Sequence, residues 1–234
     1  MKVLFGMPCY GGQMMSDTDL AFVETRSGLQ QDGIDFAKYV LSNESLVHRA
    51  RNKIANEMLS GKYDKLMWID SDIGWKYADL RRLLFSDKPV IGGTYPMKTY
   101  PITLNFNCLP EHFKYFKRNK TMQEYYKWAK ECADPNTGEV EVMHVPTGFL
   151  LTDKSVFFTL KDKVEQYDSY DFHTGKKTVM YDFFPSKVVN RCLESEDWGF
   201  SRICRENGIK IYMNTRSITT HTGTHCFRAE PEVV

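Results

Sequence analysis

Apolar residues along the first hundred positions alternate between short continuous runs and longer stretches of helical spacing. The short runs predict buried strands over Lys2–Met7, Asp35–Leu41, Lys65–Ile69 and Pro89–Thr94. Between them, apolar positions recur every three to four residues and predict helices over Thr18–Gln31, Ser45–Leu59 and Tyr77–Phe85. This alternation is typical of right-handed βαβ units and a mostly parallel sheet. Ligands of such sheets bind at the carboxyl ends of the strands.

The regular alternation stops after Pro96. Residues 97–140 are rich in aromatics and lysine, show no clear period, and end in a turn at Asp134–Gly138. Beyond that turn the pattern predicts strands over Val142–Val145, Gly148–Thr152, Val179–Phe184 and Ile209–Met213, and helices over Lys154–Leu160 and Ser195–Asn207. The sequence contains no repeat and no linker, so we expect residues 1–234 to form one α/β domain.

Composition excludes several classes of protein. Lys and Arg total 31 while Asp and Glu total 30, so there is no global basic field of the kind that binds nucleic acid non-specifically. The six cysteines are scattered without CxxC spacing, which favours free thiols in a reducing compartment. No apolar run approaches the roughly 20 residues of a membrane span. The apolar start of the chain is too short for a signal peptide, so we expect a cytoplasmic protein.

The acidic triplet Asp70-Ser71-Asp72 follows the apolar strand Lys65–Ile69 directly. Two carboxylates at the carboxyl end of a buried strand can hold a hard divalent cation. Mg²⁺ and Mn²⁺ prefer oxygen ligands, and Mg²⁺ in particular is usually held by one or two carboxylates together with substrate phosphates. The alternative is that Asp72 or a neighbour only caps the helix that follows.

Arg49 and Arg51 lie on the helix predicted before that strand. Side chains two residues apart on a helix point about 200° away from each other, so only one of the two arginines can face a given ligand. Arginine forms paired hydrogen bonds with phosphate groups or base edges, and we place Arg51 and Asn52 near a nucleotide on that ground. The other arginine is expected to be a solvated surface side chain.

Three further segments carry candidate chemistry. Ser195 begins a predicted helix, so Glu196 and Asp197 fall in its first turn, where the helix dipole stabilises ionised carboxylates. They are either ordinary N-terminal acids, or Asp197 is a general base at the mouth of a pocket. His221 and His225 follow the last strand, and either imidazole is a candidate metal ligand or a structural histidine. In the segment 144–149, Gly148 allows a close backbone approach beside a pocket, or a simple turn in the core.

Taken together, these motifs resemble the GT-A glycosyltransferases, in particular the family-2-like group that includes many phage- and large-virus-encoded members. The resemblance runs over nearly the whole chain. Its motifs are 7–12, 43–46, 49–52, 68–74, 92–96, 196–197 and 221–223. It implies a Rossmann-like GT-A fold with a mostly parallel central sheet flanked by helices. Residues 1–96 would form the nucleotide-binding half and residues 97–234 the acceptor-binding half, with an insertion at about residues 97–140.

The resemblance also implies roles for individual residues. The nucleotide is expected to contact Pro8, Cys9, Tyr10, Asn43, Arg51, Asn52, Asp70 and Ser71. The metal, Mn²⁺ or Mg²⁺ bridging the diphosphate, is expected on Asp70, Asp72 and His221. Donor or acceptor sugar is expected at Thr147, Gly148, Glu196 and Trp198. Asp197 matches the acid that deprotonates the acceptor hydroxyl in inverting members. Because retaining GT-A enzymes share the metal motif, the stereochemical outcome stays open.

The expected activity is transfer of a sugar from a nucleotide-diphosphate sugar, by default a UDP-sugar, to a hydroxyl acceptor. One alternative is an acceptor in a modified base of DNA, because residues 112–120 interleave aromatic and basic side chains. A nucleotidyltransferase is disfavoured, since no basic residue follows Gly11-Gly12. A non-enzymatic carbohydrate-binding protein with a degenerate site is disfavoured by the intact acids Asp70, Asp72 and Asp197 and by His221.

Overall fold

The computed structural model describes residues 1–116, 121–170 and 174–223. Its centre is an eight-stranded sheet with the order β2-β1-β3-β8-β5-β13-β7-β6. The strands are β1 (Lys2–Cys9), β2 (Asp35–Ser42), β3 (Lys65–Ile69), β5 (Val90–Thr94), β6 (Asn107–Cys108), β7 (Glu139–His144), β8 (Phe149–Asp153) and β13 (Ile211–Ile218). Six of the eight point the same way, and only β7 and β8 run against them. The predicted mostly parallel α/β sheet is confirmed.

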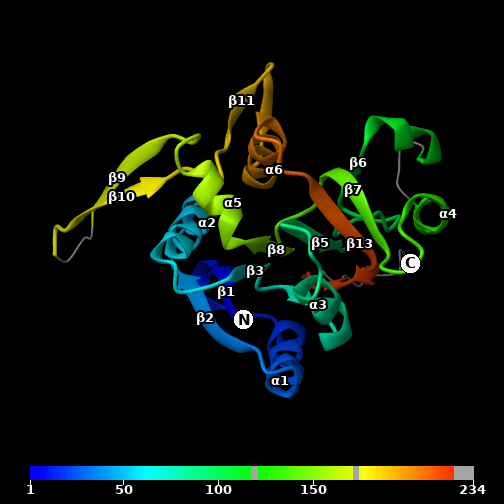
Figure 1. Cartoon of the computed structure of the whole chain (residues 1–234), viewed down its shortest axis with the longest axis horizontal. Coiled ribbons are helices and arrows are strands. Elements are labelled where there is room, and N and C mark those ends of the chain that lie inside the picture. Colours follow the sequence, from blue (N-terminus) through cyan, green and yellow to red (C-terminus); the bar gives the residue numbers. More distant parts are fainter. Residues whose placement is uncertain (117–120, 171–173, 224–234) are drawn as a thin grey trace, which may run out of the picture.

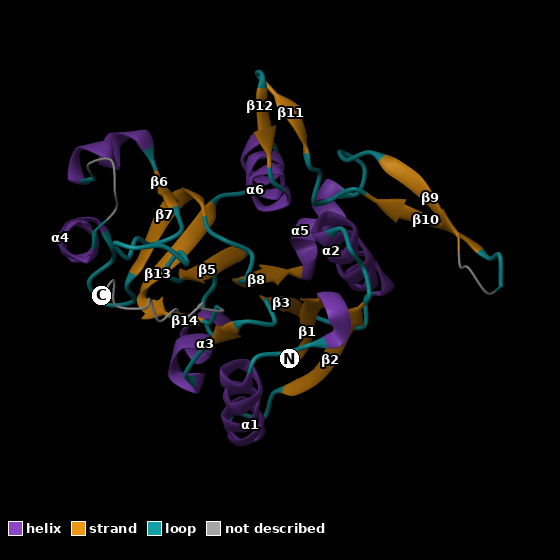
Figure 2. Cartoon of the chain, turned by 180° about the vertical axis from the view of Figure 1, so that it is seen from behind, coloured by secondary structure: helices purple, strands orange, loops and turns teal. Residues whose placement is uncertain are grey.

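Helices cover both faces of this sheet (Figures 1 and 2). One face carries α1 (Ser16–Gln31) and α3 (Tyr77–Leu84). The other carries α2 (Val47–Asn56), α5 (Lys154–Leu160) and α6 (Glu196–Glu206). The alternation of side chains along β1 explains the two layers, because Val3, Phe5 and Met7 pack with the first pair of helices while Leu4 packs with the second group. Strands buried on both faces are what the continuous apolar runs predicted.

The region 97–140 is more regular than its sequence pattern indicated. Residues 110–115 form a 3-10 helix and α4 spans Met122–Cys132. A reciprocal cap starts α4, because the Thr121 hydroxyl accepts from the Glu124 backbone N–H and the Glu124 carboxylate accepts from Thr121. Tyr125 and Trp128 are buried against Phe106. The prediction of irregular structure was therefore wrong for this helix, whose aromatics form a packed extension of the core.

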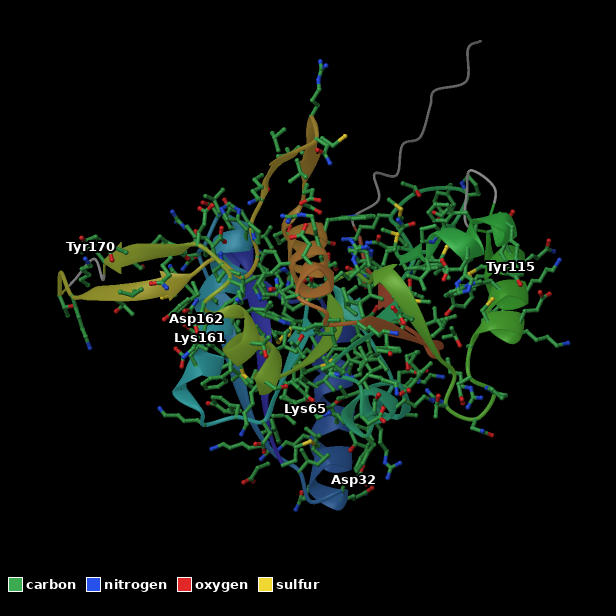
Figure 3. The ribbon with its side chains drawn as sticks, turned by 45° about the horizontal axis from the view of Figure 1, so that its top comes forward. Asp32, Lys65, Tyr115, Lys161, Asp162 and Tyr170 are labelled. Carbon is green, nitrogen blue, oxygen red and sulfur yellow. The ribbon has the colours of Figure 1, made fainter. Side chains whose placement is uncertain are left out.

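Two antiparallel hairpins lie outside the main sheet. One joins β9 (Gln166–Tyr170) and β10 (Lys177–Tyr181), and the other joins β11 (Lys187–Val189) and β12 (Cys192–Glu194). Both project from the body in Figure 1. Figure 3 labels Tyr170 on the first hairpin and Tyr115 near α4, at opposite ends of the molecule. The strand predicted over 179–184 is shorter and earlier, because Phe183 and Phe184 leave it to pack against α5 and α6.

Two observations bear on the remaining expectations from composition. The cysteines within the described ranges, Cys9, Cys108, Cys132, Cys192 and Cys204, are all free thiols, as predicted. Cys226 and His225 lie outside the described residues. In the part of the chain that the structure describes, no helix is long and apolar enough to cross a membrane.

Candidate functional site

The acidic triplet forms a fixed turn between β3 and the short strand β4 (Ile73–Gly74). The Asp70 N–H donates to the Gly148 carbonyl at 3.1 Å, and the Ser71 carbonyl accepts from the Met15 N–H at 2.8 Å and from the Thr18 hydroxyl at 3.1 Å. These bonds use backbone groups of the triplet and leave its carboxylates to other partners. The alternative that Asp72 caps a helix was wrong, because α3 begins only at Tyr77, with Lys76 before it.

Gly148 brings the chain against the first of these carboxylates. A Cβ at this position would lie 2.7 Å from Asp70 Oδ2 and 2.7 Å from Tyr95 Oη, so any side chain here would collide with both. The close approach that the sequence allowed is therefore present beside the acidic turn. Thr147 is buried next to it, and its hydroxyl has no hydrogen-bond partner among the described residues. Tyr95 was not predicted as a site residue, although it stands in the motif 92–96.

Arg51 connects the acidic turn to the first turn of α6. Its side chain is only 4% exposed, and it donates from Nη2 to Asp70 Oδ1 at 3.0 Å and from Nε to Glu196 Oε1 at 3.1 Å. Burial by itself lowers the pKa of Arg51, but the two carboxylates outweigh it and raise the pKa further above its usual value. Arg49 faces elsewhere and pairs with Glu44 at 2.6 Å. One arginine of the pair thus reaches the site, as the helical spacing predicted.

Asn52 takes a place different from the one expected. Its carboxamide nitrogen donates to Asp182 Oδ1 at 2.6 Å, and its oxygen accepts from the Phe184 N–H at 2.9 Å. The residue is 1% exposed. Both ends of the amide are therefore engaged in holding residues 182–184 against α2, and the structure does not bring this side chain to Arg51 and Asp70.

Asp72 and His221 face each other across a short pairing of strands. In β14 (Thr220–His221), His221 pairs with Ile73 of β4, and its Nε2 lies 3.5 Å from Asp72 Oδ2. The ring Nδ1 lies 2.8 Å from the Pro96 carbonyl oxygen. Because a carbonyl oxygen can only accept, Nδ1 carries a proton, so Nε2 is the nitrogen that faces Asp72. It donates to the carboxylate when the ring is protonated and offers a lone pair to a cation when the ring is neutral.

A lysine, Lys98, joins Asp72 and His221. Lys98 Nζ lies 2.5 Å from the same Asp72 Oδ2. Burial raises the pKa of Asp72, but the contacts with His221 and Lys98 outweigh it and lower the pKa to about 2. The carboxylate is therefore ionised throughout the neutral range. Lys98 carried no prediction from sequence.

Asp197 lies in the first turn of α6, as predicted, and is held by several contacts. Its Oδ2 lies 3.1 Å from Nε2 of buried His144, and its Oδ1 accepts from the Ser195 hydroxyl and from the Trp198 N–H. The Trp198 ring stacks on His144 with 4.5 Å between centroids. Burial raises the pKa of Asp197, while His144 and Ser195 outweigh it and lower the pKa to about 2. Sequence reasoning missed His144 as a partner, since nothing local links residues 144 and 197.

The residues expected at the nucleoside lie at the ends of β1 and β2. The two strands are paired up to Cys9 and Ser42, so Tyr10 and Asn43 leave the sheet as neighbours. Tyr10 is 73% exposed, and Asn43 is exposed with a left-handed φ of 62°. Cys9 is buried, and its thiol donates to the Gln13 carbonyl at 2.9 Å. Pro8 precedes it and is half-buried. An exposed ring beside an exposed amide offers stacking and hydrogen bonding to a base.

The charge of the site fits a bound cation. Four carboxylates, Asp70, Asp72, Glu196 and Asp197, stand against two permanent cations, Arg51 and Lys98. The excess is two negative charges before either histidine is protonated. Among the described residues no group of three or more His, Cys, Asp or Glu side chains surrounds a common point. A cation here would rest on Asp72 and His221, with its other ligands supplied by phosphate and water.

The cavity next to the acidic turn does not define this site. One cavity of about 410 Å³, lined by residues including Asp17, Trp75 and Thr220, lies beside β4 and contains none of the four acids. We therefore place the site by its convergent side chains at the ends of β3, β5 and β14, because carboxyl ends of strands are where ligands of such sheets bind.

Comparison with known proteins agrees with the fold. No family model matches the chain, and no curated protein matches it. Among solved structures, A197 from STIV superposes with a TM-score of 0.50 at 13% identity, covering 99% of this chain and 100% of that one. GalNAc-T7 with UDP, GalNAc and Mn²⁺ superposes with a TM-score of 0.52 at 12% identity, covering 94% of this chain and 43% of that one. This chain thus spans less than half of GalNAc-T7.

These likenesses show the class of fold. The chain has the GT-A-like α/β fold that its motifs predicted, with helices on both faces of the sheet. Identities of 12–13% carry the fold and no more. The family-2 resemblance and the viral type stay predictions, and activity has to be argued from the site.

Proposed function

We propose that this protein is a metal-dependent glycosyltransferase that moves a sugar from a nucleotide-diphosphate sugar to a hydroxyl acceptor. The observation that carries the proposal is the pair Asp72 and His221. The Nδ1 proton of His221 is committed to the Pro96 carbonyl, and Nε2 faces Asp72 Oδ2 at 3.5 Å. A histidine whose second nitrogen is held by a backbone carbonyl is the usual arrangement of a metal ligand.

The donor would lie along the ends of the strands. Tyr10 and Asn43 are suited to the nucleoside, and the acidic turn 70–72 to the diphosphate through Mn²⁺ or Mg²⁺. When bound, the cation would neutralise charge that develops on the departing diphosphate. Arg51 would hold Asp70 and Glu196 in place, because its buried guanidinium donates hydrogen bonds to both carboxylates. UDP is the first nucleotide to test, since the similar GalNAc-T7 was solved with UDP and Mn²⁺.

Asp197 would act on the acceptor. Its carboxylate accepts the proton of the acceptor hydroxyl as that oxygen bonds to the anomeric carbon. The bond from the anomeric carbon to the diphosphate breaks, and the diphosphate leaves with the electron pair. His144 would fix the carboxylate, because its ring is clamped by the stacked Trp198. Attack from the face opposite the leaving group inverts the anomeric centre. Thr147, Gly148, Glu196 and Trp198 would surround the sugars.

In the described part of residues 112–120, the stacking surface that a modified-DNA acceptor would need is reduced, although Phe113 stays 51% exposed. His112 and Phe116 contact the Trp128 ring, so these two aromatics form packing rather than a free stacking surface. Lys117, Arg118 and Lys120 lie outside the described residues. We therefore favour a carbohydrate or other small hydroxyl acceptor.

A thermal-shift panel of nucleoside diphosphates, each with Mn²⁺ or with chelator, tests the proposal. A ligand at about a hundred times its dissociation constant adds roughly 2.7 kcal/mol to stability, which is a visible shift. We expect one nucleotide to stabilise the wild type only with metal, and to leave Asp72→Ala unshifted. Asp168→Asn, in an exposed ion pair on the β9–β10 hairpin, is the matched control. No metal-dependent shift with any nucleotide would contradict the proposal and favour a non-enzymatic protein.

A further inference from the structure

Lys98 and His221 converge on a single oxygen of Asp72. The ammonium lies 2.5 Å from Oδ2 and the imidazole Nε2 lies 3.5 Å from the same atom. The Lys98 side chain is 41% exposed, whereas that of Asp72 is 27% exposed. An ammonium and a divalent cation compete for the same lone pairs of a carboxylate, so both cannot bind this oxygen at once.

The loop that carries Lys98 has a fixed base and an open tip. The Asn105 N–H donates to the Tyr95 carbonyl at 3.0 Å, and the Met97 N–H donates to the Thr103 carbonyl at 2.8 Å. Lys98 is the first residue beyond this short ladder. Tyr100, near the tip, is 90% exposed. The backbone position of Lys98 is thus set by the ladder, while its side chain reaches back over the site.

The aliphatic part of the Lys98 side chain packs against Gly223. A Cβ at Gly223 would lie 2.9 Å from Lys98 Cδ and 3.4 Å from Cε, so the stem lies against this bare backbone two residues after His221. Because a lysine ends in a flexible four-carbon stem, its charge can change partner without movement of the loop.

We propose that Lys98 is a diphosphate-binding residue of the donor site, and that it pairs with Asp72 only while no cation is bound. This inference rests on the proposed function. Without a cation the ammonium balances the charge of Asp72. In the loaded site it is repelled from that oxygen by the like charge and turns to the diphosphate, which brings the nearest negative charge. Lys98 therefore opposes binding of the metal alone and favours binding of the nucleotide with metal.

Lys98 is thus expected to weaken binding of the metal alone and to strengthen binding of the nucleotide with metal. Calorimetric titration of Lys98→Gln tests both effects. With Mn²⁺ alone we expect about two- to fivefold tighter binding, because a partly exposed ion pair that competes for Asp72 is lost. With saturating Mn²⁺, we expect the nucleoside diphosphate selected by the thermal-shift panel to bind about tenfold more weakly, as for a lost charge-assisted hydrogen bond. Lys98→Arg keeps the cation and should keep the nucleotide affinity within about threefold.

Lys154→Gln is the matched control, because Lys154 is 43% exposed and pairs with Asp64 at 3.1 Å, away from the site. It should change neither affinity. Unchanged nucleotide affinity in Lys98→Gln would overturn the inference and leave Lys98 as a surface ion pair. Weaker binding of Mn²⁺ alone would also overturn it. Failure of the proposed function is distinguishable, since it shows in the wild type itself as nucleotide binding that is absent or independent of Mn²⁺.

Discussion

Asp70 and Asp72 are separated by one residue, yet their surroundings differ in kind. Asp70 pairs with a guanidinium that is buried among α2, β3 and α6. Asp72 faces a partly exposed ammonium and an imidazole that come from a loop and from the last strand. The two carboxylates are about equally exposed, at 29% and 27%, so the difference lies in their partners. The partner of Asp70 is fixed by burial, whereas the partners of Asp72 can give it up to a ligand. An acidic triplet can thus combine an anchor with an open ligand position.

Removing Arg51, the buried partner of Asp70, should have the largest effect on the free energy of unfolding. Arg51→Met leaves the Asp70 and Glu196 carboxylates without their shared cation, and breaking a buried ion pair costs about 3–5 kcal/mol. Urea unfolding measures this directly. Arg49→Met, on the same helix but with a half-exposed side chain, is the control and should cost about 1 kcal/mol or less. Equal losses in the two variants would remove the distinction between an anchor and a surface pair.

Asp197 extends the comparison, because it is fixed like Asp70 but offers a carboxylate to a substrate. Asp197→Asn keeps the shape and removes the base, so we expect transfer to fall by about 10²–10⁴. Binding of nucleotide with Mn²⁺ should stay unchanged, since no contact joins Asp197 to Asp72 or His221 among the described residues. Turnover and calorimetry on the same preparation separate the two. A fully active Asp197→Asn protein would contradict the assignment of this base.

Replacing Asp72 should affect ligand binding more than the stability of the fold. Asp72→Asn removes a ligand of the proposed cation, so the nucleotide-linked stabilisation of roughly 2.7 kcal/mol at a hundredfold excess should disappear. Without ligand, its partly exposed pair with Lys98 should cost about 1 kcal/mol or less. Asp70→Asn should differ by also lowering stability without ligand, because buried Arg51 loses one of its two carboxylate partners. Thermal unfolding with and without Mn²⁺ and nucleotide compares the two variants.

The dependence of stability on pH gives a smaller effect. The pKa of Asp197 falls from 3.8 to about 2 on folding, so its ionised form stabilises the native state above pH 4, and this is lost as pH falls toward 2. The shift corresponds to about 2 kcal/mol. The unfolding free energy of wild type minus that of Asp197→Asn should therefore decrease by this amount between pH 6 and pH 2. Other carboxylates cancel in the difference. A constant difference would show that His144 does not stabilise the charge.

Much of this arrangement was predictable from sequence. The apolar runs ending at Met7, Ile69 and Thr94 predict buried strands, and the residues just beyond them must meet at one edge of the sheet. The about 200° between Arg49 and Arg51 predicts that only one of them reaches that edge. Gly148 is a signal of close approach because only glycine fits beside Asp70.

Other features depend on contacts that no local pattern encodes. His144 and Asp197 meet only after β7 and α6 are packed together. Lys98 reaches Asp72 through a loop whose ladder joins residues 95–97 to 103–105. The turn of the β11–β12 hairpin uses Asn190 and Arg191 at φ of 49° and 66°, without the glycine that usually marks such a turn. The α4 helix, in contrast, has a capping signal at Thr121 and Glu124 that sequence reasoning should include.

The central claim is that Asp72 and His221 together hold a divalent cation with a nucleoside diphosphate. Electron paramagnetic resonance of Mn²⁺ tests it most directly, because bound Mn²⁺ loses the signal of the free ion. We expect wild type to bind Mn²⁺ more tightly when UDP is present, and His221→Gln to bind it at least about tenfold more weakly, since even outer-shell partners of a metal contribute that much. Asp168→Asn should match the wild type. Equal Mn²⁺ affinity in wild type and His221→Gln would contradict the claim.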